Sequence, residues 1–206
     1  CSWGAEQMLK NPDYAVVYGD EYFINDKSEI TAIYEAKHPF SYERLFCVEL
    51  VPPAQAAFIR TSMMKQVGLY ADTTLKTCPD YEIWVRLGAK YPFRHEFGIV
   101  CKYRHHRQSE GCRPDMVEKM VTAKLSVINR VINDSKTPIK VKILKNRALA
   151  GLYHWGGNVA NSVGLYQLAL KYYCLSWYYK PKISKLIEII KFLIHHVPNY
   201  LKNQIV

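Results

Sequence analysis

The 206-residue sequence lacks several features that mark specialised classes of protein. Its six cysteines show no CxxC spacing, so we expect reduced thiols in a cytosolic compartment and neither a disulfide framework nor a structural zinc site. No apolar run is long enough to cross a bilayer and no charged leader precedes an apolar stretch, so we expect a protein that is neither exported nor membrane-spanning. The start at Cys1-Ser2-Trp3, without Met, leads us to expect that further sequence precedes it.

Positive charge is concentrated in the second half of the chain. Residues 1–115 contain 14 Lys and Arg against 15 Asp and Glu, whereas residues 116–206 contain 14 against 3. This excess of basic residues would attract anionic partners, either the headgroups of a cytoplasmic leaflet or nucleic acid.

Residues 1–113 alternate between helical and extended patterns, as in an α/β domain. Asn11-Pro12-Asp13 breaks a helix before residues 14–18, an apolar and partly β-branched run typical of a buried strand. We expect helices at 3–10, 61–68 and 80–90, and strands at 14–18 with an extension at 21–24, at 30–34 as its hairpin partner, at 54–59 as a central strand, and at 97–103. Glu82 and Arg86, four residues apart, are expected outside the apolar face of their helix.

The pattern of residues 114–206 is helical throughout. Pro114-Asp115 with Glu118 three positions later is typical of a capping box, and apolar residues recur on one face of the helix that follows: Val117, Val121, Leu125, Ile128 and Ile132. Residues 148–181 resemble one tetratricopeptide repeat in the spacing of Gly157, Gly164, Ala169, Ser176 and Pro181. Since one repeat cannot bury its own face, a simple helical hairpin docked on the domain is the alternative.

Residues 182–197 have the pattern of a basic amphipathic helix. One face is apolar, and the other carries Lys182, Lys185, Glu188, Lys191 and His195. Such a helix either lies on an anionic membrane surface or packs its apolar face against its own protein.

The most specific pattern consists of four segments: residues 54–60 (AQAAFIR), 67–72 (VGLYAD), 79–87 (PDYEIWVRL) and 102–109 (KYRHHRQS). In this order they resemble the second half of family 2 glycosyltransferases with the GT-A fold, in which the last three read "vGgfde", "EDyelwlRl" and "yRxH…S". Residues 11–20 (NPDYAVVYGD) likewise resemble that family's "nPdadlvygD". The resemblance covers residues 3–111 and implies a partial GT-A mixed sheet of the α/β class, followed by the helical region.

By this resemblance Asp80 is the catalytic base of an inverting sugar transfer. A carboxylate must take the proton of the acceptor hydroxyl as it attacks the anomeric carbon, and a place at a helix N-terminus stabilises the ionised form. An N-cap aspartate without chemistry is the alternative. The family usually has an acidic residue where this sequence has Pro79.

The resemblance also implies residues that bind the donor or the acceptor. Arg104 and His106 match the "yRxH" segment, which folds over the donor diphosphate; the alternative is a solvated basic turn. His105 is expected to be a bystander. Asp20 ends a predicted strand at the rim of the sheet, where it binds ligand or only caps the turn, and Trp84 is a further candidate for contact with the sugars.

The family's metal-binding motif is absent. No Asp-x-Asp or Asp-Asp pair and no glycine-rich phosphate loop occurs in the 206 residues, so no metal ligand is assigned, although His106 is the residue that the resemblance offers. The full enzyme is expected to use Mn²⁺ or Mg²⁺ with a nucleotide-sugar donor. We therefore expect this chain to be a fragment that binds nucleotide sugar poorly by itself.

The sequence thus predicts part of a glycosyltransferase that acts on a saccharide or lipid-linked acceptor in cell-surface polysaccharide or glycolipid synthesis, in the cytoplasm or at the inner face of the plasma membrane. The alternative is a non-enzymatic binding module or an inactive relative whose basic tail contacts a membrane or nucleic acid. Nucleic acid is the weaker choice, because the tail's lysines alternate with Leu and Ile at helical spacing. An aromatic cluster that includes Tyr172 and Trp177 could stack bases, but on a helix it favours a core.

Overall fold

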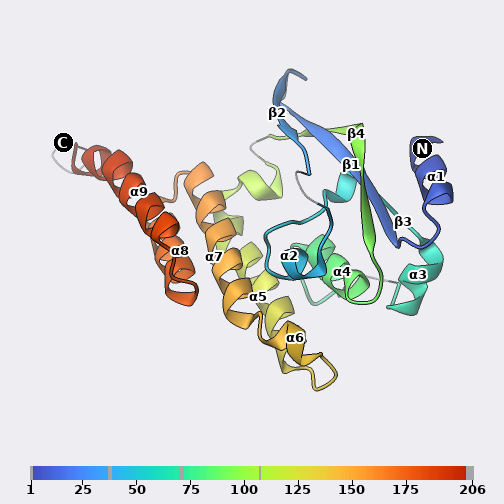
Figure 1. The fold of residues 1–206 in the computed structure, drawn as a ribbon. Helices are drawn as coiled ribbons and strands as arrows, with labels where there is room; N and C mark the ends of the chain where they lie inside the picture. The colour runs from blue at the N-terminus through green and yellow to red at the C-terminus, as the bar shows by residue number, and fades with distance from the viewer. Residues whose placement is uncertain (1, 37–38, 70–71, 107, 203–206) are drawn as a thin grey trace. The chain divides into compact units, whose positions relative to one another are not determined.

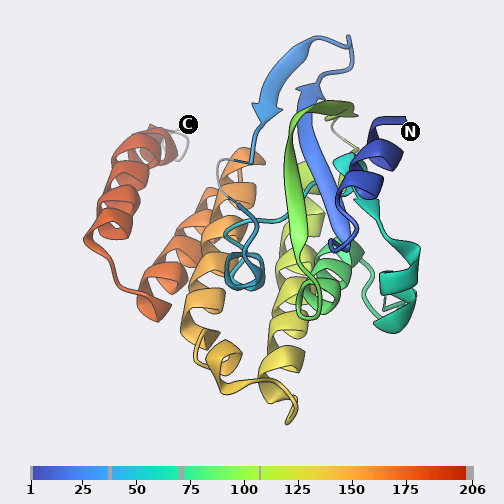
Figure 2. The same ribbon diagram turned by 45° about the vertical axis from the view of Figure 1, so that its right-hand side comes forward.

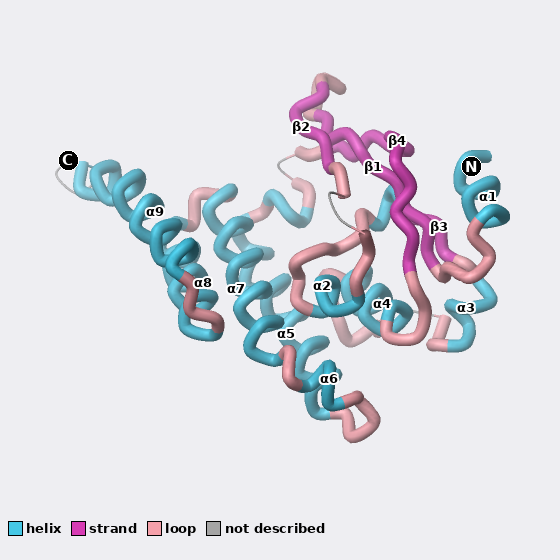
Figure 3. The backbone as a smooth tube through the Cα atoms, in the orientation of Figure 1, coloured by secondary structure: helices cyan, strands magenta, loops and turns pink. Residues whose placement is uncertain are grey.

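The computed structural model describes residues 2–36, 39–69, 72–106 and 108–202, with side chains described as far as residue 196. The chain divides into two compact units, of which the first ends at Ser109 and the second begins at Glu110. From the sequence, the boundary between the two parts was predicted near residue 113. The α/β class is confirmed, with a mixed four-stranded sheet followed by a helical region (Figure 3).

The described residues of the first unit form four α-helices, one 3₁₀ turn and the four strands of the sheet (Figure 1). In chain order these elements are α1 (Ser2–Lys10), β1 (Val16–Ile24), β2 (Ile30–Tyr34), α2 (Tyr42–Phe46), η1 (Ala54–Ala56), β3 (Ala57–Ile59), α3 (Thr61–Gln66), α4 (Pro79–Gly88) and β4 (Phe93–Arg104).

Strand β1 is the centre of the sheet. It pairs antiparallel with β2 through residues 21–24 and antiparallel with β3 through residues 16–18, and it pairs parallel with β4 along its whole length. Its first residues are fully buried, as expected of the apolar run that opens the strand. Strand β4 passes close to Gly19, since a Cβ there would be 2.9 Å from the carbonyl oxygen of Gly98.

Three predictions about this unit need correction. Residues 54–59 do not form a central strand: residues 54–56 are a 3₁₀ turn, and the short β3 pairs with β1 alone among the described strands. Strand β4 begins at Phe93, four residues earlier than predicted, because residues 93–95 pair with the start of β1. Glu82 was expected outside the apolar face of its helix, but its side chain is buried.

The second unit is helical throughout its described part. Its elements are η2 (Glu110–Cys112), η3 (Pro114–Met116), α5 (Val117–Asn133), α6 (Ile139–Lys142), α7 (Lys145–Ser162), α8 (Tyr166–Tyr179) and α9 (Ile183–Lys202). The predicted capping box is wrong: Met116 is the N-cap of α5 and makes no side-chain cap bond, while the Asp115 carboxylate binds Arg113. No helix among the described residues is long and apolar enough to cross a membrane.

Helix α7 packs between α5 and α8, and two adjacent glycines permit the close approach (Figure 2). A Cβ at Gly156 would lie 2.7 Å from a methyl carbon of Val121 on α5. A Cβ at Gly157 would lie 2.6 Å from the ring of Tyr173 on α8, whose hydroxyl is 2.9 Å from Asn158 Oδ1. In the predicted helical hairpin, small residues of α7 therefore pack against bulky residues of the neighbouring helices.

Replacing Gly157 by valine is expected to destabilise the second unit by about 2 kcal/mol, because overpacking against Tyr173 outweighs the small gain in helix propensity. Urea unfolding followed by hydrogen exchange of α7 and α8 peptides measures the change. Gly111→Val is the matched control, since no atom lies within 4 Å of its added Cβ, and it should stay within about 0.5 kcal/mol of wild type. Equal effects at both positions would contradict the packing argument.

Candidate functional site

Asp80 lies in the first turn of α4, on a rigid part of the first unit. Cys78, the N-cap, has a left-handed backbone (φ 53°, ψ 42°), and Pro79 occupies the first helical position. The Asp80 side chain is half-buried, and its Oδ1 accepts a hydrogen bond of 2.8 Å from the backbone N–H of Tyr81. The alternative prediction that Asp80 is itself the N-cap is therefore wrong, although the first-turn position still favours the carboxylate.

Buried side chains of α4 hold this helix start in place. The Tyr81 hydroxyl donates to the carbonyl of Phe46 at 2.8 Å, and the Trp84 indole nitrogen donates to the carbonyl of Pro52 at 3.1 Å. Burial raises the pKa of Tyr81 well above its usual value, so the hydroxyl stays a donor. The Trp84 ring is buried edge-on to Phe93, and a contact with sugar would require this ring to be uncovered first.

Arg86 forms an ion pair within α4 and also connects this helix to the end of α3. Arg86 Nε lies 2.8 Å from Glu82 Oε1, and the same guanidinium donates to the carbonyls of Val67 and Gly68. Since Glu82 is only 6% exposed, its carboxylate is held inside the protein by Arg86. Arg86 thus holds the end of α3 close to the helix that carries Asp80.

Asp20 is not at the rim of the sheet, which corrects the sequence-based expectation. Strand β1 continues past it to Ile24, and Asp20 is 5% exposed. Its Oδ1 lies 2.7 Å from His95 Nε2 and accepts from the N–H of Ala36 at 3.2 Å, while its Oδ2 accepts from the N–H of Gly98 at 3.1 Å. Both oxygens are therefore engaged by neighbouring segments of the same unit.

Glu21 and Cys101 form a second buried polar group that sequence reasoning missed. The Gln55 amide donates to Glu21 Oε2 at 2.6 Å, and the Cys101 Sγ lies 3.5 Å from the same oxygen. Burial raises the pKa of Glu21, and burial together with this carboxylate raises the pKa of Cys101 to about 11. The signal available in the sequence was the pair of adjacent acids inside an apolar strand.

Arg104 and His106 lie at the exposed end of β4, as predicted, but both have partners there. Arg104 donates to the Asn25 carbonyl at 2.5 Å and to Ser28 Oγ at 2.9 Å, so it braces the turn between β1 and β2. His106 Nδ1 accepts from the N–H of Gln108 at 3.2 Å, which places the proton of a neutral ring on Nε2. In this geometry the segment matches the alternative of a solvated basic turn.

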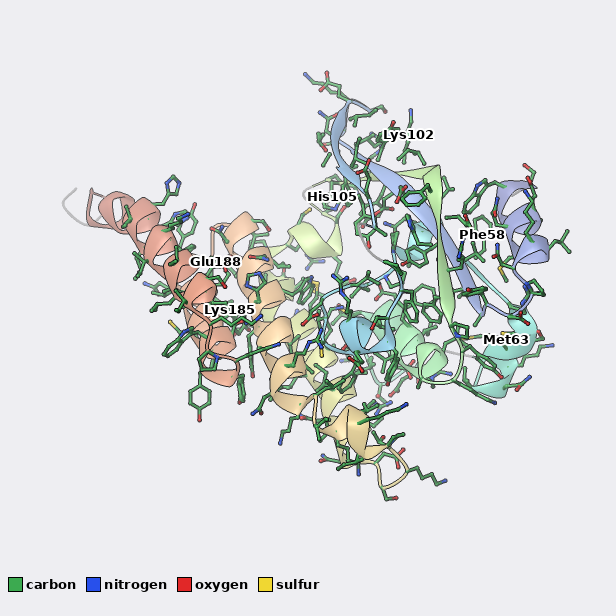
Figure 4. The ribbon with its side chains drawn as sticks, in the orientation of Figure 1. Phe58, Met63, Lys102, His105, Lys185 and Glu188 are labelled. Carbon is green, nitrogen blue, oxygen red and sulfur yellow. The ribbon has the colours of Figure 1, made fainter. Side chains whose placement is uncertain are left out.

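His105 belongs to a cluster of rings at the same end of the sheet (Figure 4). Its ring centroid lies 4.8 Å from that of Phe23 and 5.1 Å from that of Tyr103. Burial, with a smaller contribution from the neighbouring His106, lowers the pKa of His105 and favours the neutral ring.

The described residues do not form a metal site. They contain no group of three or more His, Cys, Asp or Glu side chains placed to hold an ion, and the carboxylate of Asp20 already accepts from three donors. His106 alone does not make such a site. No disulfide joins the described cysteines Cys47, Cys78, Cys101, Cys112 and Cys174.

Comparison of the chain with protein-family models and with curated proteins found no match.

Proposed function

We propose that this chain is the acceptor side of a glycosyltransferase, with Asp80 as the base. The observation that carries the proposal is the state of the acidic residues in the family-like segments. Asp20 and Glu82 are buried and bound to His95 and Arg86, whereas Asp80 is half-exposed and forms no ion pair with any described residue. Of these three carboxylates, Asp80 is therefore the one best placed to take a proton from a bound ligand.

The reaction that suits this carboxylate is an inverting displacement. The acceptor hydroxyl oxygen forms a bond to the anomeric carbon while its proton passes to an Asp80 oxygen. The bond between that carbon and the nucleotide diphosphate breaks, and the diphosphate leaves with the electron pair. The rigid start of α4 supports this role, because a base must stay within hydrogen-bond reach of the hydroxyl throughout the attack.

The donor is proposed to be held mainly by residues outside this sequence. The chain has no Asp-x-Asp motif and no glycine-rich phosphate loop, and its described residues form no metal group. Arg104 and His106 are already partly engaged in hydrogen bonds within the protein. We accordingly expect this chain alone to bind UDP or GDP weakly, which calorimetry can measure.

The proposal is tested with Asp80→Asn in protein from the complete gene, assayed for transfer from a panel of nucleotide sugars with Mn²⁺ or Mg²⁺. The amide keeps the shape of the side chain but cannot accept the proton, so we expect a loss of transfer on the order of 10³-fold with donor affinity unchanged. Asp26→Asn, an exposed acid in the β1–β2 turn, is the control and should keep full activity. Unchanged transfer in Asp80→Asn would exclude the base role.

One observation favours a second candidate, an inactive relative of these enzymes. Asp20 and Arg104, two of the residues predicted to bind ligand, are engaged in bonds within the protein. An inactive relative would show no transfer and no nucleotide-sugar hydrolysis in the wild type under any condition of the same assay.

A further inference from the structure

Helix α9 carries a continuous row of exposed aliphatic side chains, here called the α9 stripe. It consists of Ile183, Leu186, Ile187, Ile190 and Ile194, each between 42% and 79% exposed. Their spacing of three and four residues places them along one face of the helix. Five large aliphatic side chains in one row on the surface are more than the scattered exposure that is usual for a soluble protein.

The opposite face of α9 is the one that packs against the neighbouring helices, so the alternative that the apolar face packs against its own protein does not hold for the α9 stripe. Lys185 Nζ donates to Ser176 Oγ on α8 at 2.6 Å, and Glu188 Oε2 lies 3.8 Å from His154 Nδ1 on α7. Figure 4 shows both side chains on the side of α9 toward these helices. Ile189 is buried, and Phe192 packs edge-on against Tyr173 at 5.3 Å.

At about 100° per residue, the positions of Lys185, Ile189 and Phe192 are centred roughly opposite the α9 stripe. The helix is thus anchored to its own unit by its mixed polar and aromatic face. Its purely aliphatic face is left outward.

The surroundings of the α9 stripe are basic and aromatic. Residues 171–202 contain six lysines and one acidic residue, and Lys182 and Lys191 are exposed at the level of the stripe. Trp177 and Tyr178 are exposed at the end of α8, just before α9 begins. Aliphatic side chains flanked by lysines and by aromatic rings with a polar end are the combination that suits the boundary between acyl chains and anionic headgroups.

We propose that the α9 stripe docks on an anionic lipid surface, with the stripe in the acyl boundary and Lys182 and Lys191 at the headgroups. The positive charge around the stripe favours an anionic lipid surface over the two other possible partners, a nucleic acid and a second copy of the chain. A nucleic acid would meet the lysines but leave the aliphatic row against phosphates, and a second copy of the chain would bring like charges together. The inference is independent of the proposed transfer reaction, because it concerns binding only.

The test is flotation of the whole chain with vesicles of phosphatidylcholine containing 30% phosphatidylglycerol, compared with phosphatidylcholine alone. Wild type should bind the anionic vesicles and lose binding as salt is raised. Ile187→Gln with Ile190→Gln should lower the partition coefficient at least about tenfold, and Lys182→Gln with Lys191→Gln about fivefold per lysine. Ile139→Gln with Ile143→Gln, at two more exposed isoleucines of the same unit, should leave it within about twofold.

Three results would overturn the proposal. Wild type that does not float with anionic vesicles has no such surface. Equal binding to neutral vesicles would remove the role of the lysines. Self-association that is abolished by the Ile187 and Ile190 changes, without vesicle binding, would identify the stripe as an interface between copies, and circular dichroism confirms that each variant is folded.

Discussion

Replacing Asp20 by alanine is expected to lower the free energy of unfolding of the first unit by about 4 kcal/mol, one of the two largest effects we expect of a single change. The buried carboxylate accepts hydrogen bonds from the ring nitrogen of His95 and from the backbone N–H groups of Ala36 and Gly98. Alanine would leave all three donors without an acceptor, at the place where β4 meets β1.

Asp20→Asn separates the loss of hydrogen bonds from the loss of volume. Each carboxylate oxygen faces a backbone N–H, so the amide must turn its NH₂ group toward one of them, at a cost of roughly 2 kcal/mol. Urea unfolding read by hydrogen exchange of peptides from β1 measures both variants, with the exposed Asp13→Ala as control. A change below about 1 kcal/mol for Asp20→Ala would show that the carboxylate is not structural and would reopen its ligand-binding role.

Replacing Arg86 by alanine is expected to destabilise the first unit by about 3 kcal/mol. The change leaves the Glu82 carboxylate buried without its cation, and it removes the guanidinium donor from the carbonyls of Val67 and Gly68. The same urea and hydrogen-exchange measurement applies, now with α4 peptides as the readout.

Two further variants make this expectation specific. Glu82→Gln combined with Arg86→Met removes both charges and should recover most of the loss, because the cost lies in the unpaired carboxylate. Arg94→Ala breaks a largely exposed pair with Glu96 and should cost less than about 1 kcal/mol. If Arg86→Ala were no worse than Arg94→Ala, the Glu82 carboxylate would have to be solvated.

The parts of the fold that the sequence predicted well are those with a strong local pattern. The strands at β1 and β2 and the helices α5, α7 and α8 follow from apolar periodicity and turn residues. Strand β3 was overestimated because an apolar run does not say how many neighbours a strand has. The start of β4 was missed because the polar residues Arg94, His95 and Glu96 carry no apolar strand pattern. Their strand is paired with β1, which lies in a distant part of the chain.

The candidate site was predicted unevenly for the same reason. Pro79 marks the start of α4, so the place of Asp80 on a helix N-terminus followed from the local sequence. Its role as a base rests on the resemblance and stays a prediction. The burial of Asp20 could not be predicted, since its partners His95, Ala36 and Gly98 are positioned only by the tertiary fold. Glu82 pairs with Arg86 on the same helix, but its burial depends on the packing of α4, which the local sequence does not show. The two faces of α9 followed from the sequence, but which of them packs stayed open, because a helical pattern identifies both faces without saying which one is buried.

The pairing of the sheet has a consequence for how the first unit folds. Among the described strands β2, β3 and β4 each pair with β1, and none of them pairs with another. The β1–β2 hairpin joins neighbours in sequence, but the β1–β4 ladder joins residues more than seventy positions apart, such as Val16 and Phe93. The hairpin can therefore form early, whereas the sheet must wait for a long loop to close, which makes β1 with β4 the slow step of folding. Once that loop is closed, the amides of β1 are released only when the whole unit opens.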